Sequence, residues 1–153
     1  CALPISIVPK PTALFVILAA MLASSCQPGP KPIKFGQENC HFCKMTITDG
    51  QYGGEVVMLK GKVYYFDDSD CLLSFLKSND ISRDMVQEYY FMDYSRPKEL
   101  VPASTGYFLK SGSLHGPMGG DLVAFTEKDS MHKFALQYKG RELRWPDILN
   151  EQP

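Results

Sequence analysis

The pattern of apolar and polar residues predicts a strand–strand–helix unit in the first half of the chain. Residues 55–59 and 62–66 are two β-favouring runs, and Lys60-Gly61 between them has the length and composition of a hairpin turn. Asp67, Asp68 and Ser69 then offer oxygen atoms that suit a helix N-cap. Beyond them, apolar residues at 72, 75 and 76 have helical spacing. We therefore expect two strands followed by one helix.

The same pattern recurs in the second half, after one further strand. Residues 86–94 favour a strand, which Arg96-Pro97-Lys98 is expected to break. Two more β-favouring runs, 106–110 and 122–125, are joined by a glycine-rich loop at 111–120. A helix is expected over about 127–138, with Lys139-Gly140 as its stop signal.

An offset of 59 residues aligns the two halves. Three pairs of residues coincide at this offset: Phe66 with Phe125, Asp70 with Asp129, and Phe75 with Phe134. Chance agreement of common residues is the alternative to a repeat. The pattern predicts an α+β fold of two related ββα lobes in a degenerate tandem duplication, at about 37–80 and 86–140 of a domain spanning 37–150. The cysteine-containing segment 40–45 of the first half and the glycine-rich loop of the second would then be candidates for a shared cleft.

The N-terminal pattern predicts a targeting segment rather than a folded element. Residues 13–23 are apolar but shorter than a membrane span, and Lys10 precedes them. Ser24-Ser25 directly before Cys26 resembles a bacterial lipobox, so we expect a lipoprotein signal peptide at 1–25 and lipid on Cys26; a plain signal peptide is the alternative. Residues 26–36 are proline-rich and predict a tether. The expected location is the bacterial envelope, facing the periplasm, on either membrane.

Composition and charge exclude one class of partner. The 153 residues are 44% hydrophobic and 22% charged, which is ordinary for a globular domain. The formal net charge is −1, and the 16 basic residues are scattered along the chain. Nucleic-acid binding needs a basic patch, so we exclude DNA and RNA as partners.

The candidate chemistry is concentrated in Cys40-His41-Phe42-Cys43-Lys44-Met45. Two thiols and a thioether so close together suit Cu(I) or thiol redox chemistry. Haem attachment is excluded because Lys44 stands where a histidine is required. A thiol-disulfide oxidoreductase of the thioredoxin type would place the pair in a βαβ setting, whereas hairpin residues follow here.

Zinc is a further alternative for this motif. It would need four ligands, and Cys71 with His41 or His115 would have to complete the set. Cys71 lies on the apolar side of a helix start, where a free cysteine is more often a small buried apolar residue.

Methionine favours copper among these alternatives. A thioether is a poor zinc ligand and a good Cu(I) ligand, and in an extended segment Met45 would share a face with Cys43. Met118 lies in a loop of glycine and proline, where core packing is a less natural explanation. His115, three residues earlier, would offer an imidazole from the same loop.

With these motifs in view, the chain resembles the NosL family, lipoproteins regarded as copper chaperones for nitrous oxide reductase assembly. The resemblance covers about residues 40–148. It is carried by the lipobox Cys26, the tether, Cys40-His41-Phe42-Cys43-Lys44-Met45, Thr46-Ile47, Asp49, Gly61-Lys62, Phe66-Asp67, Asp93-Tyr94, Pro117-Met118-Gly119 and Ala124-Phe125.

The resemblance implies two ββα lobes and delivery of Cu(I) to the reductase through membrane-associated assembly machinery. The family motif carries over onto Cys40, Cys43 and Met45, and its methionine-bearing loop onto Met118. Lys44 departs from the pattern, because a glycine is expected there in many relatives. We therefore expect a lipid-anchored copper chaperone that catalyses no reaction, with Cys40, Cys43, Met45, Met118 and His115 as candidate ligands. An envelope oxidoreductase and a zinc-stabilised lipoprotein are the alternatives.

Overall fold

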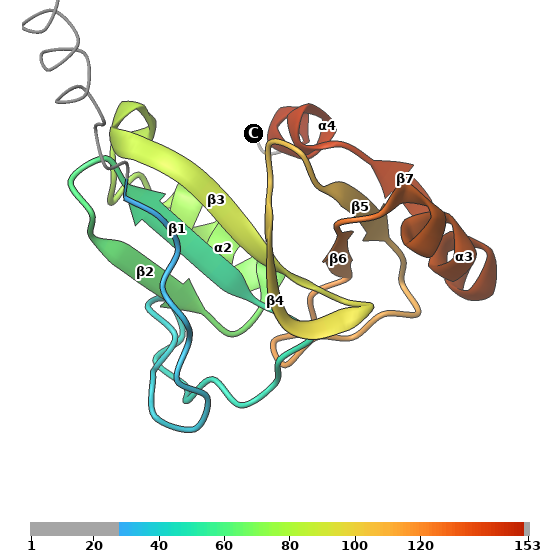
Figure 1. Cartoon of the computed structure of the whole chain (residues 1–153), viewed down its shortest axis with the longest axis horizontal. Coiled ribbons are helices and arrows are strands. Elements are labelled where there is room, and N and C mark those ends of the chain that lie inside the picture. Colours follow the sequence, from blue (N-terminus) through green and yellow to red (C-terminus); the bar gives the residue numbers. More distant parts are fainter. Residues whose placement is uncertain (1–27, 152–153) are drawn as a thin grey trace, which may run out of the picture.

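The structure of the protein, a computed structural model, describes residues 28–151 (Figure 1). The expected signal peptide at 1–25 and the expected lipidation site, Cys26, lie outside these residues. In chain order the elements are β1 (Gly54–Met58), β2 (Val63–Phe66), α2 (Ser69–Lys77), a 3₁₀ turn η1 (Arg83–Met85), β3 (Val86–Asp93), β4 (Arg96–Pro102), β5 (Tyr107–Lys110), β6 (Leu122–Phe125), α3 (Lys128–Tyr138), β7 (Arg141–Leu143) and α4 (Trp145–Asn150). Among residues 28–151, no helix has the length and apolar character needed to cross a membrane.

One mixed sheet forms the centre of the fold. Its strand order is β2-β1-β3-β6-β5-β7, and β4 pairs separately with β3. The pairs are antiparallel except β3 with β6, which run parallel and meet at Asp93 and Ala124. The helix α2 packs on the β2–β1 end, and α3 on the β5–β7 end. The α+β class expected from the sequence is therefore confirmed.

The two halves have the same order of elements within this sheet. A hairpin followed by a helix and a third strand gives the order β2-β1-β3 in the first half and β6-β5-β7 in the second. Phe66 and Phe125 are the last residues of the two hairpins, and Phe75 and Phe134 occupy the seventh position of the two helices. The halves are joined in one continuous sheet instead of forming separate lobes, and their origin by duplication stays a prediction.

Two strands and one α-helix were not expected from the sequence. The strand β3 ends at Asp93, before Arg96-Pro97-Lys98, as expected, but Arg96–Pro102 then forms β4, which turns back along β3. A register shift opposite Met92 and Asp93 leaves residues 97–99 without a partner on β3. A proline is tolerated there because it has no ladder hydrogen bond to lose. The short elements β7 and α4, which follow the expected helix stop, were also missed.

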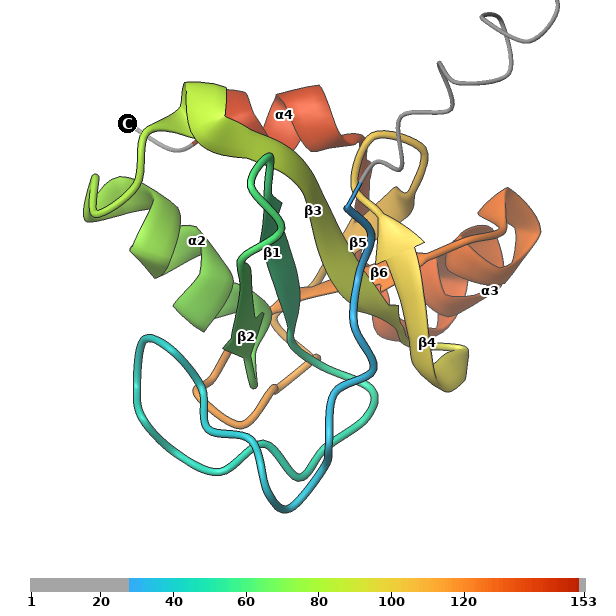
Figure 2. The ribbon, with the colours of Figure 1, turned by 60° about the vertical axis from the view of Figure 1, so that its left-hand side comes forward.

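The described end of the expected tether packs against the domain. The Lys31 backbone N–H donates to the Glu55 carboxylate on β1 at 3.0 Å, and the Ile33 side chain is buried in the core. Figure 2 shows this segment, in blue, descending along the sheet to the loops below β1 and β2. The described end of this segment therefore contacts the sheet and leads directly into the cysteine loop, and its role as a tether stays a prediction.

Candidate metal centre

The cysteine motif forms a tight loop closed by backbone hydrogen bonds. Asn39 and Thr46 form an antiparallel bridge, and the Cys40 N–H donates to the Met45 carbonyl at 2.8 Å. Lys44 has a φ of +68°, in the left-handed region, and its N–H donates to the Cys40 carbonyl at 3.0 Å. The left-handed conformation explains why a glycine suits this position. The expected extended segment, with Cys43 and Met45 on one face, is not formed.

His41 fastens this loop to the hairpin. Its N–H donates to the Tyr65 carbonyl on β2 at 2.7 Å, and its ring packs edge-on against Tyr64 and Phe75, with centroids 4.5 and 5.2 Å away. Partial burial and the positive charges of nearby lysines lower the pKa of His41. The residue thus has a packing role, and it does not belong to the group of metal-ligating atoms found among the described residues.

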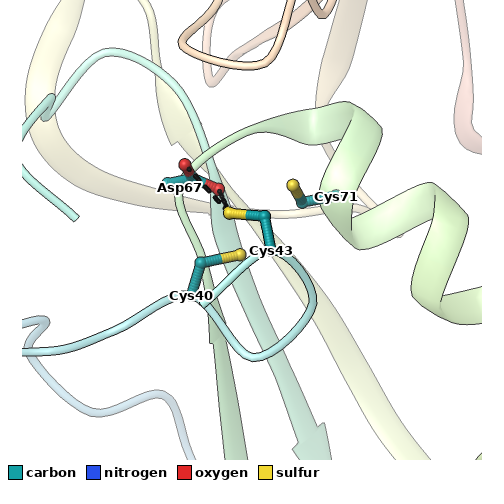
Figure 3. Close-up of side chains that lie close together, drawn as sticks. All are labelled: Cys40, Cys43, Asp67 and Cys71. Carbon is teal, nitrogen blue, oxygen red and sulfur yellow. Dashed lines mark hydrogen bonds between the residues drawn. The ribbon is translucent and has the colours of Figure 1, made fainter. Parts of the chain in front are cut away.

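Four side chains from three elements converge beside this loop (Figure 3). Cys40 and Cys43 come from the loop, Asp67 directly follows β2, and Cys71 lies in the first turn of α2. One ligand atom from each lies within 4.8 Å of the others. We call these four residues the thiol cluster. All three of its cysteines are free thiols.

The thiol cluster is largely shielded from solvent. Cys40, Cys71 and Asp67 are buried, and Cys43 is partly exposed. The Cys43 thiol donates to the two Asp67 carboxylate oxygens at 3.4 and 3.5 Å. Burial, together with a hydrogen bond to Asp67, raises the pKa of Cys40 to about 11. Burial, and then the proximity of Cys40, raises the pKa of Cys71 as well.

The raised pKa values bear on the chemistry of the two buried thiols. A thiol with a raised pKa is a poor nucleophile at neutral pH, so Cys40 and Cys71 are poorly suited to disulfide exchange. Binding of a metal ion would release protons from the thiols, because the thiolate is the ligand. Three sulfur donors and one carboxylate fit a soft or borderline ion such as copper or zinc. The geometry therefore supports metal binding over an oxidoreductase.

Met118 lies at the mouth of a pocket that reaches this cluster. Phe42, Asp70, Cys71, Ser74 and Met118 line the pocket, whose volume is about 180 Å³. The side chains of Phe42 and Met118 are each 45% exposed, whereas Cys71 is buried. The pocket therefore connects a buried thiol of the first half with an exposed thioether of the second. The two segments expected to share a cleft do meet here.

The other candidate ligands lie at the surface. Met45 is 51% exposed and follows the thiol cluster in the chain, but it does not line the pocket beside Met118. His115 is exposed and lies outside the thiol cluster. The ligand roles of Met45, Met118 and His115 therefore stay predictions, whereas the structure brings Cys40 and Cys43 together.

Sequence reasoning missed Asp67 as a member of the thiol cluster and left the role of Cys71 open. Asp67 was interpreted as a possible helix cap, and Cys71 was considered as a third zinc ligand or as a small buried apolar residue. Asp68, the next residue, is the actual N-cap of α2 and accepts the Asp70 N–H at 2.9 Å. This leaves Asp67 free to face the thiols. Two consecutive aspartates and a cysteine four residues later, at the junction of a hairpin and a helix, were the available signal.

Comparisons with known proteins show which family the chain belongs to. The family model described as NosL matches residues 32–153. The copper-binding lipoprotein NosL of Stutzerimonas stutzeri is 27% identical over 150 residues, which covers 88% of this chain and 78% of that protein. The crystal structure of the copper chaperone NosL from Shewanella denitrificans superposes with a TM-score of 0.66 at 26% identity, covering 78% of this chain and 94% of that one. The chain therefore belongs to the NosL family.

Proposed function

We propose that the protein is a copper chaperone that binds Cu(I) and passes it to a partner protein. The observation that carries the proposal is the convergence of three free thiols and a carboxylate beside a pocket that ends at an exposed thioether. Cu(I) prefers such soft sulfur ligands. The names of the similar proteins, a copper-binding lipoprotein and a copper chaperone, support the same function.

The pocket supports transfer of the ion as well as its storage. A buried four-ligand cage holds a metal tightly but obstructs its release. Here Cys43 is partly exposed, and Cys71 and Met118 face the same pocket. An acceptor ligand entering there would bind the ion before the last donor sulfur leaves. The resemblance of the motif to the family supports Cys43 and Met45 as primary ligands, and the pocket supports Met118 as the ligand that closes the site. Cys40 and Cys71 are the additional thiols that we propose to hold the ion during transfer. His115 is the weakest candidate.

Family membership supports the finer parts of the function. We propose that the chain is a lipid-anchored protein of the bacterial envelope, facing the periplasm. Its proposed acceptor is nitrous oxide reductase or the membrane-associated machinery that assembles the copper site of this enzyme. Cu(I) is the cargo in this function, and the protein itself catalyses no reaction.

A Cu(I) competition titration tests the proposal. We expect the reduced, anaerobic chain to withdraw one Cu(I) from a chromophoric chelator, and the variant Met45→Ala, Met118→Ala to bind at least about tenfold more weakly, the scale expected for changes around a metal site. The control is Met85→Ala, which removes an exposed thioether at η1, away from the thiol cluster. Binding by the double variant equal to that of the parent would contradict the thioether site.

One observation favours zinc as a second candidate for the thiol cluster. Three cysteines alone leave a zinc site one ligand short, and Asp67 supplies the fourth donor. The same preparation separates the two functions through its metal content. Zinc present in the isolated chain, with unfolding on chelation and no retention of Cu(I), would establish a zinc-stabilised lipoprotein instead. We expect Cu(I) to be retained.

A further inference from the structure

Two adjacent aspartates connect the two halves of the candidate site. Asp67 faces the thiols, and Asp68 faces the loop that carries Met118. Asp68 is fully buried, and both of its carboxylate oxygens are used. Oδ1 accepts the Asp70 N–H at 2.9 Å and thereby caps α2. Oδ2 accepts the backbone N–H groups of Met118 at 2.7 Å and Gly120 at 3.2 Å.

The loop that Asp68 holds is a compact turn. The Gly116 N–H donates to the Gly120 carbonyl and the Gly119 N–H to the Gly116 carbonyl, both at 2.9 Å. Met118 is a central residue of this turn, and its side chain is exposed. Gly116 and Gly120 approach the Asp68 carboxylate so closely that an added Cβ would lie 2.4 and 1.9 Å from its oxygens. The turn therefore packs directly against this carboxylate.

We propose that Asp68 is the positioning residue that holds the Met118 thioether at the mouth of the pocket above Cys71. The inference rests on the proposed copper function and deepens it. One carboxylate binds both the first turn of α2, where Cys71 lies, and the backbone of Met118 itself. Asp68 touches no metal in this arrangement. It sets the distance between a buried thiol and an exposed thioether that are 47 residues apart in the chain.

The variant Asp68→Ser separates the two roles of the carboxylate, the N-cap of α2 and the hydrogen bonds to the Met118 loop. Serine is as good an N-cap as aspartate, so α2 keeps its cap, but the shorter side chain cannot also reach Met118. We expect Cu(I) affinity to fall about tenfold or more, as for other residues that orient metal ligands. The matched control is Asp93→Ser. Asp93 is equally buried and accepts the Thr126 N–H at 2.9 Å, but it is not part of the thiol cluster or its pocket.

A double-mutant cycle with Met118→Ala tests whether Asp68 acts through Met118. If it does, Asp68→Ser should weaken Cu(I) binding in the parent and have little further effect in Met118→Ala. A purely structural role would lower the thermal midpoint and leave the affinity of the folded protein unchanged, as we expect for Asp93→Ser. Equal and additive effects in both backgrounds would overturn the proposal.

A second pair of variants protects the test against misfolding of Asp68→Ser. Gly116→Ala keeps the Asp68 residue but places a methyl group against its carboxylate from the loop side, so the turn and the carboxylate must move apart. Gly112→Ala is the matched control, because a methyl group there meets nothing within 4 Å. We expect only the former to weaken Cu(I) binding. If Met118→Ala itself leaves binding unchanged, the thioether part of the proposed function fails. If Met118→Ala weakens binding but Asp68→Ser and Gly116→Ala do not, the present inference alone is overturned.

Discussion

At the scale of single residues, the cysteine loop contains one residue, Lys44, in a backbone conformation that its side chain disfavours. Lys44 directly follows Cys43 in the tight loop that presents Cys40 and Cys43, and its φ is +68°. A left-handed residue with a Cβ is strained, and a glycine there is not. The loop geometry that places both thiols therefore carries a small energetic cost.

Replacing Lys44 by glycine should release this strain. We expect Lys44→Gly to raise the free energy of unfolding by up to about 1 kcal/mol, since the left-handed penalty exceeds the extra entropy of an unfolded glycine. Lys44→Ala is the control, because alanine keeps the Cβ and should show no such gain. Chemical denaturation of the reduced proteins measures both. A loss of stability in Lys44→Gly would show that φ is not the source of strain.

At the scale of elements, a buried carboxylate joins the N-terminal segment to the sheet. Glu55 on β1 is fully buried and accepts the Lys31 N–H through one oxygen, and its other oxygen has no hydrogen-bond partner among residues 28–151. Its register neighbours are Tyr65 on β2 and Tyr90 on β3. Burial raises the pKa of Glu55 to about 7, against an ordinary value of 4.5, even though the Lys31 N–H acts in the opposite direction.

This shift makes stability depend on pH in a defined window. The folded state binds the Glu55 proton more tightly than the unfolded state, so the contribution is complete below pH 4.5 and is lost as pH rises to about 7. The loss is on the order of 3 kcal/mol for a shift of this size. Glu55→Gln should abolish this decline and be more stable than the parent above pH 7.

Thermal or urea unfolding across this range measures the difference between parent and variant. The control is Glu99→Gln, because Glu99 is an exposed carboxylate on β4 and should leave the pH dependence of the parent unchanged. Parallel curves for the parent and Glu55→Gln would show that Glu55 is ionised in the folded protein throughout.

At the scale of the whole molecule, the C-terminal helix holds the two halves of the sheet together. Trp145 in α4 packs against Tyr89 and Phe91 on β3 and against Phe108 on β5, with ring centroids 5.1, 5.5 and 6.0 Å apart. It belongs to the larger of the two apolar clusters, which draws residues from both halves. The helix α4 therefore completes the apolar core that the two halves share.

Removal of this indole should weaken the entire domain. We expect Trp145→Ala to lose about 3–5 kcal/mol of stability, the usual cost of removing a large buried aromatic side chain. Leu136→Ala is the control for this variant, because Leu136 is 71% exposed.

Thermal unfolding of the parent should be a single transition, since one sheet spans both halves. Two separate calorimetric transitions would instead indicate independent lobes.

Much of the fold could be predicted because it depends on local patterns. Both hairpins, both long helices and the strand at β3 follow from apolar spacing and turn residues. The strand β4 could not, because Pro97 is tolerated only through a register shift that involves β3. The elements β7 and α4 are short, and tertiary contacts of Trp145 and Leu143 stabilise them. Such contacts leave no periodic signal in three to six residues.

The sequence by itself determined the soft chemistry of Cys40 and Cys43, the α+β class and the resemblance that led to the family. Only the tertiary structure decided that Asp67 and Cys71 join these thiols, and that Asp68 holds the Met118 loop. The reason is physical. Residue type determines what an atom can bind, whereas a site also requires atoms from distant segments to lie within a few ångströms. That proximity is produced by packing of the loop, the helix and the sheet.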